Sequence, residues 1–269
     1  MSFKDILVHL DGGDGDKATL DAAIGIAKRF GARLTGLFAR EENLGPAVVA
    51  RQPSDQIKDM ATALEGPFMA ACSQAGVTAR WWFIPHGGKS EITGEVLFCS
   101  FFADLTIVGQ GAASGQHVPD SFAEDLILKS GHPVMMVPAS YNTSSVGLKV
   151  ALGWRASREA VRAARDSLPF LTSADWVKVI AIGPRTHTPD DLPRVNILDH
   201  LAQHGVTAEG DQLEIEGLGV MDALLSRSYD HDCDLLVVGA HGGYVLPLGR
   251  GSATRHLLRH ASIPVLFSH

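Results

Sequence analysis

The sequence predicts an α/β protein made of two tandem, doubly wound parallel sheets of five strands each. The first reason is an internal repeat, because an aspartate, a short apolar run and a glycine at 104–109 recur at 234–239. In both copies a glycine-bearing loop and a helical stretch follow, and a proline then opens a last apolar strand, at 132–137 and 263–267. The second reason is the alternation of strand-like and helix-like runs within each half, which is typical of βαβ units.

The other strands are expected at matching places in the two halves. They are predicted at 6–10, 33–39 and 79–84 in the first half and at 150–154, 176–182 and 212–215 in the second. The first helix of each half should bury one face, carried by Leu20, Ile24, Ala27 and Phe30 and by Val161, Ala164 and Leu168. A Rossmann-like or flavodoxin-like strand order of 3-2-1-4-5 is expected for each sheet.

A stretch of turn formers and small polar residues at 138–147 marks the join between the halves. We therefore predict one domain over residues 1–138 and a second over 148–269. The last strand of each domain is apolar and would be an unprotected sheet edge if that domain stood alone. The two edges are expected to pair about a pseudo-twofold axis, which gives an intramolecular pseudo-dimer and leaves a further homodimer open.

Composition narrows the class of partner. The chain has 269 residues and a formal net charge of −7, so no general field attracts nucleic acid. No apolar run is long enough to span a membrane, and the first residues do not resemble a signal peptide. The three cysteines form no CxxC pair, as expected in a reducing compartment. We expect a cytoplasmic protein with no nucleic-acid or membrane partner.

The loop after the fourth strand of the second half is the strongest candidate site. Its glycines let the backbone approach an anion closely. A helix follows the loop directly, so unpaired backbone N–H groups and two arginines are expected together at the start of that helix. These are the features that bind phosphate. The candidate site residues are Gly239, His241, Gly242, Arg250, Gly251, Ser252, Ala253 and Arg255.

This loop resembles that of the universal stress protein family, whose nucleotide-binding members carry Gly-x-x-Gly, nine residues, and then Gly-Ser or Gly-Thr. The matching residues are Gly239, Gly242, Gly251 and Ser252, although eight residues separate Gly242 from Gly251 here. The resemblance extends in pattern over both halves and implies a tandem member of the family. It also implies that ATP, with Mg²⁺, binds the second half.

The first half resembles the family at a different point. Asp11 stands where the family places an acidic residue near the adenosine end of the nucleotide, whereas Arg155 takes the equivalent place in the second half. The helix after the fourth strand of the first half opens near Asp120, Ser121 and Glu124. Carboxylates there satisfy the helix dipole and repel phosphate, so we expect no nucleotide in the first half.

The family resemblance implies a regulatory stress-response module that binds an adenine nucleotide and an unknown protein partner. No catalytic or metal-ligating residue is predicted, and at most weak ATP hydrolysis is expected. Two alternatives stay open at this point: a nucleotide-free stress protein that binds a protein partner, and a hydrolase of a small metabolite, because doubly wound folds host many chemistries.

Overall fold

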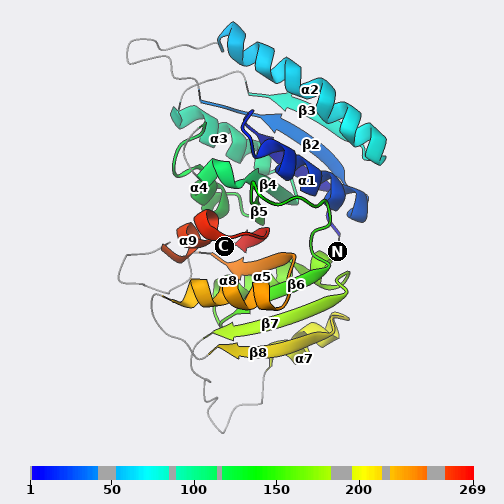
Figure 1. Cartoon of the computed structure of the whole chain (residues 1–269), viewed down its shortest axis with the longest axis vertical. Coiled ribbons are helices and arrows are strands. Elements are labelled where there is room, and N and C mark those ends of the chain that lie inside the picture. Colours follow the sequence, from blue (N-terminus) through cyan, green and yellow to red (C-terminus); the bar gives the residue numbers. More distant parts are fainter. Residues whose placement is uncertain are drawn as a thin grey trace.

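All strands of the computed structural model belong to one sheet of order β3-β2-β1-β4-β5-β10-β9-β6-β7-β8 (Figure 1). The structure describes residues 2–41, 53–84, 89–113, 117–182, 196–213, 219–240 and 252–269. In Figure 1 the first half of the chain forms the upper part of the molecule and the second half the lower part, with β5 and β10 between them.

The strands are β1 (Asp5–Leu10), β2 (Arg33–Phe38), β3 (Ala79–Phe83), β4 (Leu105–Gly109), β5 (Val134–Val137), β6 (Lys149–Trp154), β7 (Trp176–Ile182), β8 (Ala208–Leu213), β9 (Leu235–Gly239) and β10 (Val265–Ser268). The α-helices are α1 (Asp16–Phe30), α2 (Asp55–Ala75), α3 (Lys89–Ser100), α4 (Phe122–Lys129), α5 (Arg158–Asp166), α6 (Leu168–Leu171), α7 (Ile197–Gln203), α8 (Val220–Asp230) and α9 (Ser252–His260), and η1 (Gln110–Ala113) is a 3-10 helix.

Each half of the sheet has the predicted order 3-2-1-4-5, and all pairs within a half are parallel. The two halves join where β5 and β10 pair antiparallel, with Met135 opposite Leu266. Both side chains are fully buried. The fold class and the pairing of the two apolar edges are therefore confirmed, and the two predicted sheets form one mixed sheet of ten strands.

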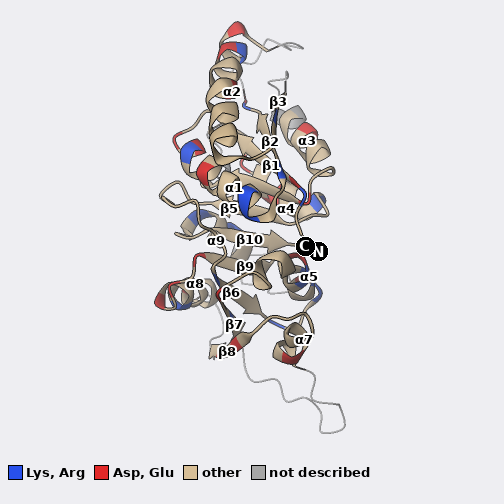
Figure 2. Cartoon of the chain, turned by 90° about the vertical axis from the view of Figure 1, so that its right-hand side faces the viewer, with Lys and Arg blue, Asp and Glu red and all other residues tan. Residues whose placement is uncertain are grey.

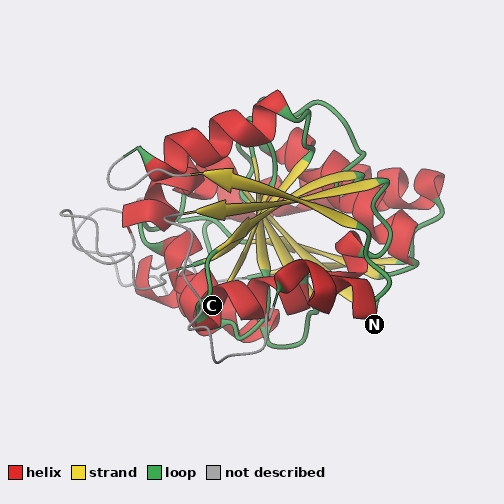
Figure 3. Cartoon of the chain, turned by 90° about the horizontal axis from the view of Figure 1, so that it is seen from below, coloured by secondary structure: helices red, strands yellow, loops and turns green. Residues whose placement is uncertain are grey.

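Helices cover both faces of this twisted sheet (Figure 3). One apolar layer is formed with side chains of α1, α2, α5, α6 and α7, and the other with side chains of α3, α4, α8 and α9. Strand residues alternate between the layers: Met135 and Leu266 belong to the first, and Met136 and Phe267 to the second. Both layers thus continue through the junction of the halves.

The aspartates that open the repeated strands have the same structural role in both halves. Asp104 accepts hydrogen bonds from the backbone N–H groups of Lys4 (2.6 Å) and Asp5 (3.0 Å), where β1 begins. Asp234 accepts them from the backbone N–H groups of Leu148 (3.0 Å) and Lys149 (2.8 Å), where β6 begins. The repeat read from the sequence is therefore also a repeat of side-chain contacts.

The segment between the halves packs against α1. Gly25 leaves room for it, because a Cβ there would lie 1.8 Å from the carbonyl oxygen of Ser144. Arg29 donates to the carbonyl oxygens of Val146 (2.8 Å) and Gly147 (3.0 Å). These contacts hold the connection in place, and the domain bounds at 138 and 148 stay a prediction.

Two details of the sequence prediction are wrong. The third strand of the second half was expected at 212–215, but β8 begins at Ala208 and residues 214–215 lie outside the described residues. Its start was missed because its first five residues are exposed or half-buried and carry little apolar signal. Val161 was assigned to the buried face of α5 but is 57% exposed. The face that packs is formed by Ala160, Ala163 and Ala164, whose small side chains let α5 lie close to β9.

Charged residues lie on helices of both halves, with basic and acidic residues interspersed along the ribbon (Figure 2). Among the described helices, none is both long and apolar enough to cross a membrane.

We expect Leu266→Ala to lower the free energy of unfolding by about 2–5 kcal/mol, because it opens a cavity where the two halves meet. Urea denaturation followed by circular dichroism measures this. Leu148→Ala is the matched control, since Leu148 is 37% exposed. An equal, small loss in both variants would show that the β5–β10 junction contributes little to stability.

Candidate functional site

The winding of the sheet reverses once in each half, beside β1 and beside β6. β1 lies between β2 and β4, and β6 lies between β7 and β9. In open α/β sheets, ligands bind beyond the carboxyl ends of the strands at such points. The two points are therefore the places to look for a site.

In the second half, Gly239 is the last residue of β9 and lies against the start of α5. A Cβ at this position would be 2.5 Å from the carbonyl carbon of Glu159 and 2.6 Å from the nitrogen of Ala160. Packing between β9 and α5 therefore requires glycine here, whatever ligand binds. From the sequence, Gly239 was interpreted as the end of the repeated fourth strand and as part of a ligand loop, and its contact with α5 was not foreseen.

The other predicted site residues are only partly described. His241, Gly242, Arg250 and Gly251 lie outside the described residues. Ser252 is the first residue of α9, and Ala253 is half-buried in its first turn. Because α9 runs back toward the start of β10, its first turn lies at the edge of the sheet where β9 ends. The grouping of these residues around a ligand stays a prediction.

Arg255, predicted to offset phosphate charge, forms an ion pair with the first half of the chain. Its Nε lies 2.6 Å from Oε1 of Glu124, on α4, and its side chain is 52% exposed. A second contact links the end of α9 to η1 of the first half, since the Gln110 amide donates to the carbonyl oxygens of Arg259 (3.2 Å) and Ala261 (3.1 Å). The helix of the predicted phosphate site is thus tied to the first half.

Glu159 is a charged residue at this point that the sequence analysis missed. Its side chain is only 14% exposed and lies beside Gly239. A hydrogen bond from its own backbone N–H holds the pKa of the carboxyl below its usual range, helped by the Ser157 hydroxyl and the Arg158 charge against a smaller effect of burial. The helix-start pattern of Ser157 followed by Glu159 was the available signal.

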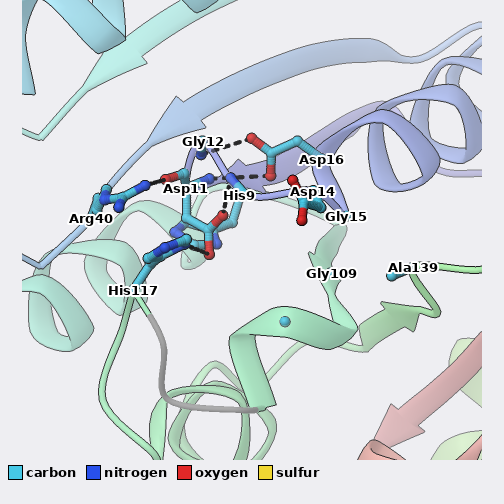
Figure 4. Close-up of a pocket in the computed structure, with 12 residues that line it drawn as sticks. His9, Asp11, Gly12, Asp14, Gly15, Asp16, Arg40, Gly109, His117 and Ala139 are labelled. Carbon is cyan, nitrogen blue, oxygen red and sulfur yellow. Dashed lines mark hydrogen bonds and ion pairs between the residues drawn. The ribbon is translucent and has the colours of Figure 1, made fainter.

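In the first half, the reversal point holds a cavity of about 430 Å³ (Figure 4). Its walls come from the end of β1, the loop that follows it, Arg40 after β2, and Gly109 at the end of β4. Asp11, the predicted strand-end acid, lies in it with an 11% exposed side chain, and its Oδ2 is 3.4 Å from Nδ1 of His117. The Arg40 guanidinium donates to the backbone oxygen of Asp11 (3.1 Å).

Two carboxylates in this cavity accept hydrogen bonds from the loop that joins β1 to α1. Asp16 accepts from the backbone N–H groups of Asp11 (3.3 Å) and Gly12 (2.8 Å), and Asp11 accepts from that of Gly13 (2.8 Å). Three consecutive backbone donors are thus already used within the loop, as the dashed lines in Figure 4 show.

Burial and the neighbouring Asp11 carboxylate raise the pKa of Asp16 to about 7, against the opposing effect of its backbone hydrogen bonds. Burial also lowers the pKa of His9, more than Asp11 raises it. His9 is therefore neutral, and since its Nε2 lies 2.8 Å from the carbonyl oxygen of Ala39, that nitrogen carries the proton.

Among the described residues, the buried cysteines are poor nucleophiles. Burial raises the pKa of Cys72 to about 11 and that of Cys233 to about 12, so neither thiol is a ready nucleophile. In the part of the chain that the structure describes, no group of three or more His, Cys, Asp or Glu side chains could hold a metal ion.

One part of the chain is similar to a known protein family. Residues 202–269 match the model of the universal stress protein family, over a stretch that includes β9, α9 and β10. This segment is similar to the universal stress protein family. The resemblance drawn from the loop after β9 is therefore confirmed.

Solved structures extend the similarity in fold to the whole chain. A universal stress protein from Archaeoglobus fulgidus matches with a TM-score of 0.69 and 16% identity, over 98% of this chain and 96% of that chain. A functionally unknown protein from Pseudomonas aeruginosa matches with a TM-score of 0.57 and 14% identity, over 99% and 92%. Both matches concern the fold alone. No match is found among the curated proteins.

We expect Gly239→Ala to destabilise the ligand-free protein, because the new methyl group would contact the backbone of α5. The cost should be about 1–3 kcal/mol in urea denaturation. Gly94→Ala is the control, since Gly94 lies in α3 with open space around it and alanine favours helix. If both variants keep wild-type stability, β9 and α5 do not pack as closely as described.

The pKa of Asp16 predicts a pH dependence of stability. Between 3.8, its ordinary value, and about 7, the unfolded chain has lost a proton that the folded chain keeps, so the free energy of unfolding falls as pH rises through this window. Asp16→Asn removes this contribution. The free energy of unfolding of the variant, relative to that of wild type, should therefore increase with pH by at most about 1.4 kcal/mol per pH unit. This increase should level off above about pH 7. A stability difference that stays constant between pH 5 and 8 would contradict the raised pKa.

Proposed function

We propose that this chain is a regulatory universal stress protein of the cytoplasm that binds an adenine nucleotide, ATP with Mg²⁺, at the start of α9. Gly239, His241, Gly242, Arg250, Gly251, Ser252, Ala253 and Arg255 are the residues assigned to the site. The first half is its pseudo-symmetric partner, and turnover of ATP is weak or absent.

The observation that carries this proposal is the contrast between two equivalent helices. α4 begins with Glu124 and Asp125 in its first turn, whereas the first turn of α9 has no acidic residue. Because the helix dipole favours an anion at a free N-terminus, only α9 is suited to phosphate. The family match of residues 202–269 supports the same helix.

The ion pair between Arg255 and Glu124 bears on how a phosphate would bind. The Arg255 side chain is 52% exposed but that of Glu124 only 17%, so a phosphate would have to compete with the Glu124 carboxylate for the guanidinium. Nucleotide binding would then loosen one contact between α9 and α4. The proposal therefore includes a weak effect of the nucleotide on how the halves meet.

A partner-binding function without nucleotide is the second candidate, and one observation favours it. Phe98, Phe101 and Phe102 form a cluster at the end of α3. The ring centroid of Phe101 lies 6.4 Å from that of Phe98, and the ring centroid of Phe102 lies 5.4 Å from it. Their exposed fractions are 61%, 47% and 61%. Clustered exposed aromatic rings are typical of protein interfaces.

Titration of Mg²⁺–ATP by calorimetry tests the nucleotide proposal. Gly251→Asp should weaken binding at least tenfold, about 1.4 kcal/mol, because it adds a side chain and a negative charge where the phosphates would lie. Gly66→Asp is the matched control, since Gly66 lies on α2 in the first half with open space around it. Equal affinity in Gly251→Asp and wild type, or no binding up to millimolar ATP, would refute the proposal and leave the partner-binding function.

A further inference from the structure

The cavity beside β1 has the wrong hydrogen-bonding groups for an anion. Phosphate sites in this position use free backbone N–H groups at the turn after the first strand. Here the N–H groups of Asp11, Gly12 and Gly13 are all taken by the carboxylates of Asp16 and Asp11. An anion would have to displace a carboxylate to reach them.

The charges that line the cavity also disfavour an anion. Asp11, Asp14 and Asp16 carry carboxyl groups, and Arg40 carries the one guanidinium among the described lining residues. The Arg40 guanidinium already donates to the backbone oxygen of Asp11. His117 lies with its Nδ1 against the Asp11 carboxylate. The cavity therefore has a negative balance that its own cations do not remove.

His9 adds an independent observation, because a polar atom of its buried side chain has no hydrogen-bond partner among the described residues. The residue is 2% exposed and lines the cavity. Its Nε2 is used by the carbonyl oxygen of Ala39, so Nδ1 of the neutral ring is a bare acceptor, with no hydrogen-bond partner among the residues that the structure describes. A ligand next to this nitrogen must be a donor.

We infer that this cavity binds a small organic cation, one that presents ammonium or guanidinium N–H groups to the Asp11 carboxylate and to Nδ1 of His9. The cavity volume of about 430 Å³ falls within the usual range for small-molecule sites. A bare metal ion fits less well, since the described residues hold no group of side chains arranged for one. This site is separate from the nucleotide proposed for the second half.

The Asp16 carboxyl gives the binding a second signature. A cation beside Asp11 offsets the charge that opposes ionisation of Asp16, so binding should release a proton near neutral pH. The other titratable groups around it are Asp11, His9 and His117, with Arg40 as the fixed charge. Affinity should consequently rise between pH 6 and pH 8.

The test is calorimetric titration of the full chain with agmatine, which carries both a guanidinium and an ammonium group, at about pH 8 and low salt. Wild type should bind one equivalent, and Asp11→Asn should weaken binding at least tenfold. Asp14→Asn should weaken it by a smaller factor without disturbing the fold, because Asp14 is exposed and forms no hydrogen bond or ion pair with other described residues. Repeating the titration in buffers of different ionisation enthalpy measures the released proton.

Asp21→Asn is the matched control. It removes the same charge from α1, but Asp21 is 46% exposed, pairs with Lys17 and does not line the cavity, so its agmatine affinity should equal that of wild type. Gly251→Asp should also leave agmatine binding unchanged, which separates this site from the proposed nucleotide site. No binding up to about 10 mM agmatine, equal affinity in Asp11→Asn and wild type, or displacement of agmatine by inorganic phosphate or Mg²⁺ would overturn the inference.

Discussion

The antiparallel pairing of β5 with β10 determines where every other element of the second half lies relative to the first. Without it, each half would expose an edge strand with apolar side chains on both faces. With it, Met135 and Leu266 continue one core layer, and Met136 and Phe267 continue the other. The strands β4, β5, β10 and β9 then form the centre of the sheet. The two reversal points, at β1 and β6, flank these four strands.

This pairing also brings together the two helices that follow the fourth strands. α4 and α9 meet across the junction, where Glu124 reaches Arg255 and Gln110 reaches the last carbonyl groups of α9. The first half therefore supplies polar groups to the neighbourhood of α9.

The sequence predicted the features that depend on local pattern. The repeated Asp-to-Gly strands and the prolines before the last strands gave the strand order, the junction and the internal symmetry correctly. What it could not predict depends on contacts between distant segments. The need for glycine at 239 comes from the start of α5, and the engagement of Arg255 comes from Glu124 in the other half. β8 was misplaced because the charged start of this edge strand has no apolar alternation.

The first-half cavity shows most clearly why composition alone is a poor guide to a site. From the sequence, Asp11 was related to a nucleotide through the family, and the first half was judged unsuited to one because of acidic residues after its fourth strand. The structure adds a different reason at a different place, since the backbone donors of the first turn are consumed by Asp11 and Asp16. The equivalent turn of the second half has Arg155 and then Ser157, which caps Ala160. A shared backbone therefore offers the same N–H groups twice, and the side chains next to them decide whether those groups remain available to a ligand. In a tandem fold of this kind, the two reversal points can diverge in charge without any change in the sheet that supports them.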